Sequence, residues 1–235
     1  MWRGPDPAAL GSNVAMLQFE NVSKSFLFKG KMRPVLANAT FTAHFEENFG
    51  LLVPPRSGAT TIQNLILGAE QPDAGKVYRY GKISWPVGGV GGLIPPLSGA
   101  ENARYIAMIY GLDPDDVLAF AIDLARIGHY MDMPVKTYSS TLQKRLALSL
   151  LLALDFDMYL VAGATPLGDP EFAERAGPLL KDKLNNTPIF FLADKMERLR
   201  GRCDQIAVVD DCKLFTFAAA EDAEKFLMRE ALSYG

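Results

Sequence analysis

The sequence is poor in the features that stabilise secreted domains or anchor a chain in a membrane. Two cysteines, Cys203 and Cys212, occur in 235 residues. Their separation is not that of a metal site, so we expect neither a zinc centre nor a disulfide framework, and we predict a reducing compartment. No apolar run approaches the roughly 20 residues of a membrane-spanning helix, and the most apolar stretch, 146–153, is too short. The first seven residues lack the apolar segment of a secretory signal, so residues 1–15 are interpreted as an N-terminal extension.

A charge excess of either sign is also lacking. The 24 basic and 27 acidic residues give a net charge of −3, without a long run of one sign. This balance predicts no nucleic-acid partner. Hydrophobic residues make up 49% and charged residues 22%, which is typical of a globular protein. The length predicts one α/β domain over 16–235 that buries a sizeable core.

Apolar periodicity predicts strands in the first part of the chain and an alternation of helices and strands in the second. We expect strands at 16–22, 39–43, 49–53, 76–80, 158–162, 188–193 and 205–209. We expect helices at 60–67, 100–110, 114–127, from about 145 to 154, 170–184, 195–200 and 220–232. The glycine- and proline-rich segment 82–99 predicts an irregular loop, and Ser98 is expected to cap the helix that follows it. This order predicts a mostly parallel sheet flanked by helices, with a small antiparallel part and a helical subdomain at about 97–145.

Residues 49–61 have the layout of a phosphate-binding loop. A buried strand leads into a short loop with Gly58, and Thr60 and Thr61 open an apolar helix. The N-terminus of such a helix presents free N–H groups and the positive end of its dipole to an anion. The usual pattern is G-x-x-x-x-G-K-[ST]. In this chain Gly58 stands at the second glycine position of the pattern, Ala59 at the lysine position and Thr60 at the serine or threonine position.

Several segments then stand in the order found in one family. The chain resembles the ATP-binding subunits of ABC transporters, and within them those that export capsular polysaccharide. The segments that carry this resemblance are 17–26, 71–77, 83–88 (Ile-Ser-Trp-Pro-Val-Gly), 97–106, 135–140 (Val-Lys-Thr-Tyr-Ser-Ser), 154–160, 168–169 and 203–204. The resemblance covers about residues 16–214 and implies the P-loop fold of ABC ATPases.

The resemblance also implies partners and a location. Members form dimers that hold two ATP molecules with Mg²⁺ between the phosphate loop of one subunit and the signature motif of the other. They act on a membrane-embedded permease, here through a segment within 82–96. We therefore expect a peripheral protein on the cytoplasmic face of a bacterial inner membrane, in a homodimer or in a heterodimer with an intact ATPase.

The phosphate loop departs from the family pattern. Ala59 replaces the lysine that neutralises phosphate charge. Val53 and Arg56 replace two glycines, and Pro54 and Pro55 remove two N–H donors. Ser57, Gly58, Thr60 and Thr61 still offer amides and hydroxyls, and Thr60 is the one candidate ligand for Mg²⁺ in this loop. Arg56 either substitutes for the missing lysine or is solvated.

The positions that would perform hydrolysis are altered as well. Ala162 and Gly163 stand where the family has the aspartate that holds Mg²⁺ and the glutamate that polarises water. Asp194 stands where the family has a histidine that contacts the terminal phosphate. His44 and His129 are not placed to substitute for it, and we interpret both as structural or surface residues.

The remaining positions of the family pattern are partly kept. Ser139 of the signature motif is expected either to cap a helix or to reach a phosphate in trans, whereas Thr141 replaces a glycine. Phe26 stands where an aromatic ring stacks on adenine, and it is equally well explained as a core residue. Gly168 and Asp169 match the loop that contacts the partner subunit.

The altered positions suggest that the fold was kept while the chemistry was lost. Our leading hypothesis is a pseudo-ATPase that serves a polysaccharide exporter as a structural or regulatory subunit. Two alternatives stay open. The first is a working ATPase that uses Arg56, and the second is a sensor that binds ATP without turnover, with Phe26 and the loop residues as its binding groups.

Overall fold

In the computed structural model, residues 14–28, 30–163 and 169–233 are described. The chain divides into two compact units. The first contains the described residues up to Ile83, the segment Leu160–Gly163 and the described residues from Pro188 onward. The second contains Ser84–Tyr159 and the described residues up to Thr187. The predicted subdomain at about 97–145 falls within the second unit, and its bounds stay a prediction. The predicted extension 1–15 lies almost entirely outside the described residues.

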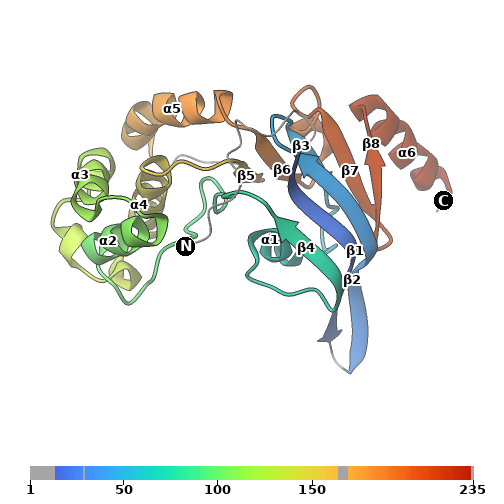
Figure 1. Ribbon diagram of the computed structural model, residues 1–235, viewed down its shortest axis with the longest axis horizontal. Coiled ribbons are helices and arrows are strands. Elements are labelled where there is room, and N and C mark those ends of the chain that lie inside the picture. The colour runs from blue at the N-terminus through green and yellow to red at the C-terminus, as the bar shows by residue number, and fades with distance from the viewer. Residues whose placement is uncertain (1–13, 29, 164–168, 234–235) are drawn as a thin grey trace. The chain divides into compact units, whose positions relative to one another are not determined.

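An antiparallel sheet opens the first unit (Figure 1). Its strands are β1 (Ala15–Phe28), β2 (Lys31–His44) and β4 (Ala74–Arg79), in the order β2-β1-β4. Alternation of apolar and polar residues directs one face of β1 to the core. Phe19, which is fully buried, lies opposite Phe41 on one side and Val77 on the other.

A second, mostly parallel sheet carries the centre of the same unit. Its strands are β3 (Phe49–Leu52), β5 (Tyr159–Ala162), β6 (Ile189–Ala193), β7 (Gln205–Asp210) and β8 (Lys213–Phe217), in the order β5-β6-β3-β7-β8. The central strand β3 pairs in parallel with both β6 and β7, whereas β8 runs antiparallel to β7. Every residue of β3 and β6 is buried, as expected of strands covered on both faces.

Stacked phenylalanine rings join the two sheets. The ring of Phe41 lies 4.5 Å from that of Phe19 and 5.0 Å from that of Phe49. The ring of Phe49 in turn lies 5.2 Å from that of Phe190. Because each ring buries a large apolar area and the rings are offset from one another, this stack fixes the sheets face to face. The rings of Phe49 and Phe190 belong to the amino-terminal ends of β3 and β6.

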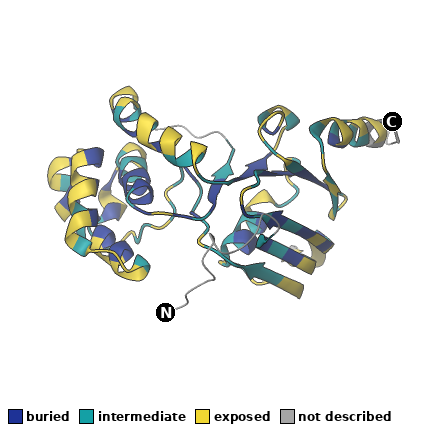
Figure 2. Ribbon diagram, turned by 45° about the horizontal axis from the view of Figure 1, so that its top comes forward, coloured by how far each residue is buried: buried dark blue, intermediate teal, exposed yellow. Residues whose placement is uncertain are grey.

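The second unit is helical. Its main helices are α2 (Gly99–Tyr110), α3 (Pro114–Ala125), α4 (Ser140–Leu152) and α5 (Pro170–Asn185). The seven residues from Leu146 to Leu152 are all buried, as expected of a helix that is apolar on nearly all sides. Figure 2 shows that α2 and α3 instead bury one face and expose the other. The described residues contain no helix that is both long and apolar enough to span a bilayer.

The structure extends or corrects several predicted elements. The strand predicted at 16–22 is the first half of β1, and the strand predicted at 39–43 is the last part of β2; each observed strand has 14 residues. The strand β8 was missed, because its residues are only exposed or half-buried and its apolar alternation is short. The segment 195–200 contains only a short 3-10 turn, Met196–Arg198, in place of the predicted helix. The helices α1 (Ala59–Leu67) and α6 (Ala220–Ser233) agree with their predictions.

Candidate functional site

The loop 53–58 leaves the carboxyl end of β3 and leads directly into α1. Its first amide, Val53 N–H, donates to the carbonyl of Ala193 at 2.8 Å, and Ser57 N–H donates to Pro54 at 3.1 Å. Arg56 and Gly58 both adopt positive φ angles, 69° and 85°. Such angles suit glycine, so Arg56 stands in a backbone conformation that a glycine would adopt without strain. The loop therefore has a glycine-like backbone conformation at a residue that is not glycine.

The start of α1 offers amides but no cation. Gly58 is the residue before the first turn of α1, and no side chain caps that turn within the described structure. Ala59 and Thr60 are exposed and Thr61 is half-buried. The first N–H groups of the helix are thus available to an anion. The methyl group of Ala59 adds no charge to them.

A pocket of about 460 Å³ lies beside this loop. Its lining comes from β1, β2, the loop and the turn between β7 and β8, through Phe26, Arg33, Pro34, Val35, Arg56, Ser57, Gly58, Asp211 and Cys212. The pocket brings together four residues singled out from the sequence, Phe26, Arg56, Ser57 and Gly58. The contributions of Arg33, Asp211 and Cys212 were missed, because only strand pairing places β2 and the β7–β8 turn beside the loop.

Phe26 is a partly exposed aromatic side chain next to a lysine. Its side chain is 40% exposed, which argues against the alternative that it is a core residue. The ammonium group of Lys24 lies 5.2 Å from the centre of its ring, a cation–π distance. Lys24 also pairs with Glu70 at 2.7 Å, and this hydrogen bond raises the pKa of Lys24. An aromatic face next to a fixed cation can stack on a heterocyclic base.

The ends of β5 and β6 carry an unexpected arrangement of charge. Asp194, directly after β6, forms an ion pair with Arg198 at 2.9 Å. Gly163, directly after β5, has φ 73° and donates its N–H to Leu192 at 3.0 Å. The guanidinium Nη1 of Arg198 lies 3.6 Å from the place where a side chain on Gly163 would begin. A positive group thus occupies the neighbourhood in which the family pattern puts a carboxylate.

The residues of the loop, the pocket and the strand ends suit the base and phosphates of a nucleotide better than its Mg²⁺ ion. The aromatic ring of Phe26, the loop amides and the hydroxyl of Thr60 suit a base and a phosphate. Magnesium ions are usually held through one or two protein carboxylates, and Ala162 and Gly163 provide none. No group of three or more histidine, cysteine, aspartate or glutamate side chains suitable for a metal occurs in the described part of the chain. The pocket therefore suits a nucleotide, whereas the strand ends do not suit Mg²⁺.

Ser139 and Asp169 both act as helix caps in the second unit. The hydroxyl of Ser139 accepts a hydrogen bond from Leu142 N–H at 3.3 Å at the start of α4, next to the exposed Thr141. Asp169 caps α5 by accepting from Phe172 N–H at 3.1 Å. Asp169 also binds Arg145 of α4 through two hydrogen bonds, of 2.7 and 2.5 Å, and this lowers the pKa of Asp169 to about 2. A role of either residue in trans stays a prediction, and Gly168 lies outside the described residues.

The irregular loop 84–98 is held by one buried amide. Asn102 of α2 is fully buried, accepts from Ile94 N–H at 2.7 Å, and donates to the carbonyls of Ile94, Leu97 and Ser98. Ser98 and Glu101 form a complete capping box at the start of α2, which confirms Ser98 as the cap. The Asn102 anchor could not be predicted from the sequence, because its partners are backbone groups.

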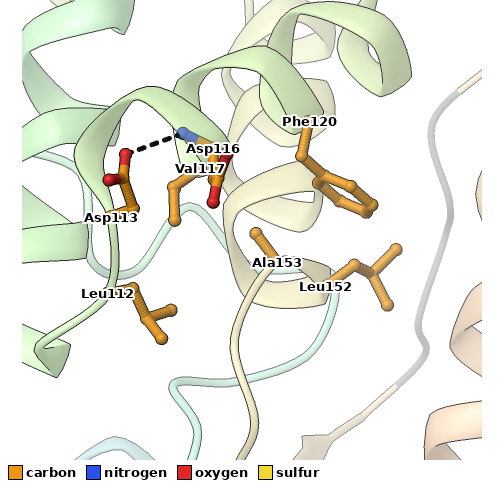
Figure 3. A pocket seen from close by; sticks show the side chains of 7 residues that line it. All are labelled: Leu112, Asp113, Asp116, Val117, Phe120, Leu152 and Ala153. Atoms are coloured by element: carbon orange, nitrogen blue, oxygen red, sulfur yellow. Dashed lines mark hydrogen bonds between the residues drawn. The ribbon is translucent and has the colours of Figure 1, made fainter.

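A second pocket, of about 310 Å³, lies between α3 and the end of α4 (Figure 3). Its apolar lining consists of Leu112, Val117, Phe120, Leu152 and Ala153, with Asp113 and Asp116 at its rim. Asp113 is engaged as the cap of α3, because it accepts from Asp115 and Asp116 N–H groups. The lining is thus mainly apolar, and one of its two carboxylates is engaged within α3.

The cysteines and histidines take no part in the candidate site chemistry. Cys203 and Cys212 are both free thiols. Burial raises the pKa of Cys203 to about 12, so this thiol is unreactive at neutral pH. Cys212 lines the first pocket but donates to the carbonyl of Pro34 at 3.3 Å. His44 and His129 do not line either pocket.

Comparisons with known proteins agree with this geometry. No family model matches the chain. It is 34% identical over 210 residues to the capsule polysaccharide export ATP-binding protein CtrD of Neisseria meningitidis serogroup B, which covers 89% of this chain and 96% of CtrD. It is 32% identical to the ATP-binding protein BexA of Haemophilus influenzae, with 89% and 95% covered. Among solved structures, the dimeric ATP-binding cassette MJ0796 in a post-hydrolysis state with ADP and Pi has a TM-score of 0.64 at 19% identity, over 86% of this chain and 98% of that one. This likeness confirms the predicted fold class.

Proposed function

The chain belongs to the family of ATP-binding proteins of polysaccharide-export ABC transporters, and from this premise we propose that it is a member that does not hydrolyse ATP. Its role is that of a structural or regulatory subunit of an exporter for capsular or related polysaccharide. It pairs with an intact ATPase subunit and a membrane-embedded permease, at the cytoplasmic face of a bacterial inner membrane.

The observation that carries this proposal is the chemistry at the carboxyl edge of the parallel sheet. Hydrolysis of a nucleotide needs a cation for the phosphates, a metal anchor and a group that orients water. Ala59, Ala162 and Gly163 supply none of these. Asp194 is paired with Arg198, and a carboxylate there repels phosphate. The loss involves separate segments of the chain, whereas the phenylalanine core and the helix caps are kept.

The same features support a dimer in which this chain completes the site of another subunit. Ser139 is exposed at the N-terminus of α4, where helix amides and a hydroxyl suit a phosphate. In an asymmetric dimer, Ser139 then serves the active site of the intact partner. One site of the pair turns over, and the other, built on loop 53–58, does not.

A second candidate function is that of a sensor which binds ATP without turnover. The pocket of about 460 Å³ with Phe26, Arg56 and Gly58 in its lining favours it. A nucleotide there leaves the chain chemically unchanged and shifts the conformation or the affinity of the complex. Phe26 supplies the base platform, Ser57, Gly58, Ala59, Thr60 and Thr61 supply amides and hydroxyls, and Asp169 acts from the partner-facing loop.

The test of the leading proposal is phosphate release by the complex with the intact ATPase that co-purifies. We expect Ser139→Asp in this chain to lower that rate at least about tenfold, because the new carboxylate repels phosphate. Asp is as good a helix cap as Ser, so Ser139→Asp keeps α4 intact and separates the two roles of Ser139. An unchanged rate contradicts the contact in trans. Mg²⁺-dependent hydrolysis by the purified chain alone contradicts the proposal as a whole, and supports a slow ATPase that uses Arg56.

A further inference from the structure

Arg198 reaches across the end of β6 toward the end of β5. Its guanidinium is bound to Asp194, which follows β6, and lies 3.6 Å from the position of a Cβ on Gly163, which follows β5. The strands β5, β6 and β3 are neighbours in the sheet, and β6 runs parallel to β3. Arg198 therefore lies at the same sheet edge from which loop 53–58 leaves.

The charge balance at this edge is the reverse of that of a metal site. The sequence contains no charged residue from 161 to 168. Between 194 and 198, Asp194 and Glu197 are offset by Lys195 and Arg198. Beside the pocket, Arg56 of loop 53–58 and Arg33 of β2 add two positive charges, and Asp211 of the β7–β8 turn adds one negative charge. A divalent cation is repelled by guanidinium groups and finds no free pair of carboxylates here, whereas a polyphosphate is attracted.

The ion pair that holds Arg198 is weak enough to be exchanged. The side chains of Arg198 and Asp194 are 40% and 43% exposed, and exposed pairs of this spacing contribute little to stability. A guanidinium has five donors in a planar fork that matches two oxygens of a phosphate. A phosphate oxygen can thus take the place of the Asp194 carboxylate without loss of a buried contact.

We propose that the first unit binds a nucleoside triphosphate without a divalent metal, and that Arg198 is an anion-binding residue which takes the place of that metal. The inference rests on the proposed function, because it concerns the same site in a subunit without turnover. Phe26 and the pocket hold the base, the amides at the start of α1 hold one phosphate, and Arg198 and Arg56 neutralise the rest. The subunit then binds free ATP and not the Mg²⁺–ATP complex.

Isothermal titration of the full-length protein with ATP tests this inference, once in EDTA and once in excess Mg²⁺. We expect the Kd in EDTA to be equal to or lower than the Kd in Mg²⁺, because Mg²⁺ competes for the phosphate oxygens. Arg198→Gln is expected to raise the Kd for ATP about tenfold, the effect of one lost charge-assisted contact. Adenosine, which has no phosphate, is expected to bind the variant and the parent equally.

A matched control is available two residues away. Arg200 is exposed and pairs with Glu224 at 2.5 Å, so Arg200→Gln removes the same charge from the same segment without touching the strand ends. We expect it to leave the Kd for ATP within about twofold of the parent, since its distance and solvent screen its charge. Thermal melting of both variants confirms that they are folded.

Three results would overturn the inference. One is ATP binding that requires Mg²⁺, and another is an Arg198→Gln variant that binds ATP like the parent. The third is an absence of any ATP binding in either buffer, which leaves a purely structural subunit standing. Failure of the proposed function has a different signature, namely Mg²⁺-dependent release of phosphate in the same samples.

Discussion

Gly58 shows how closely one residue of loop 53–58 is fitted to its neighbours. Its φ of 85° is one that other residues adopt only with strain, and a Cβ at this position would lie 2.3 Å from a methyl carbon of Val35. Gly30 has a similar φ of 74°, but there a Cβ would meet no heavy atom within 4 Å among the described residues. Alanine substitutions at these two glycines therefore separate the cost of backbone strain from the cost of side-chain overlap.

We predict that Gly58→Ala lowers the free energy of unfolding by about 3 kcal/mol, as the sum of left-handed strain and overpacking. Gly30→Ala is expected to cost about 1 kcal/mol, because only the strain applies. Urea unfolding followed by circular dichroism measures both. Equal losses in the two variants would mean that Val35 moves aside freely, and the double variant Val35→Ala/Gly58→Ala should recover part of the loss.

At the scale of elements, Asp169 joins two helices of the second unit. It caps α5 and pairs with Arg145 of α4, and its pKa of about 2 lies below the roughly 4 expected in the unfolded chain. Because its folded pKa is the lower of the two, the stabilisation is complete above about pH 4 and is lost as the pH falls from about 4 toward 2.

Two substitutions of Asp169 separate its roles. Asp169→Asn keeps a cap but loses the ion pair, and we expect it to lower the free energy of unfolding at pH 7 by about 2 kcal/mol. Asp169→Ala also loses the cap and should cost about 1 kcal/mol more. Urea unfolding at steps from pH 7 to pH 3 should show the gap between parent and Asn variant shrinking below pH 4. A gap that stays constant over that range would contradict the assignment.

The elements also show what could be predicted from the sequence and what could not. The buried strands and α4 could be assigned as strand or helix from the sequence. The reason is that burial leaves a pattern of apolar residues within a single segment. The strand β8 and the full length of β1 and β2 depend on pairing with the adjacent strand of a hairpin, as between Lys24 of β1 and Leu36 of β2. The Asn102 anchor and the Arg198–Asp194 pair join residues only four to eight positions apart. Both depend on the irregular backbone path between their partners, so the motif pattern located the candidate site without showing these contacts.

Across the whole molecule, the framework and the chemistry have changed to different extents. The fold agrees with that of an ATP-binding cassette. The charged groups expected at the sheet edge are absent or reversed. The proposal of a subunit that folds and pairs but does not hydrolyse ATP accounts for both observations.

Restoring those groups tests whether the framework is still competent. The variant with Ala59→Lys, Ala162→Asp, Gly163→Glu and Asp194→His should bind ATP at least about tenfold more tightly in Mg²⁺ than the parent, through a new lysine and new metal contacts. The glutamate at position 163 carries a penalty of about 1 kcal/mol, because Gly163 has a positive φ. Titration calorimetry measures the gain, and no gain at all would mean that loop 53–58 no longer holds phosphate.

The central claim, that the chain has lost turnover, is tested most directly by a single-turnover assay. Purified protein in large excess over ATP labelled at the γ-phosphate is incubated with Mg²⁺, quenched at intervals and separated. The account predicts that the label stays in ATP to the same extent as in a sample with EDTA. Mg²⁺-dependent release of labelled phosphate that Thr60→Ala abolishes would contradict it.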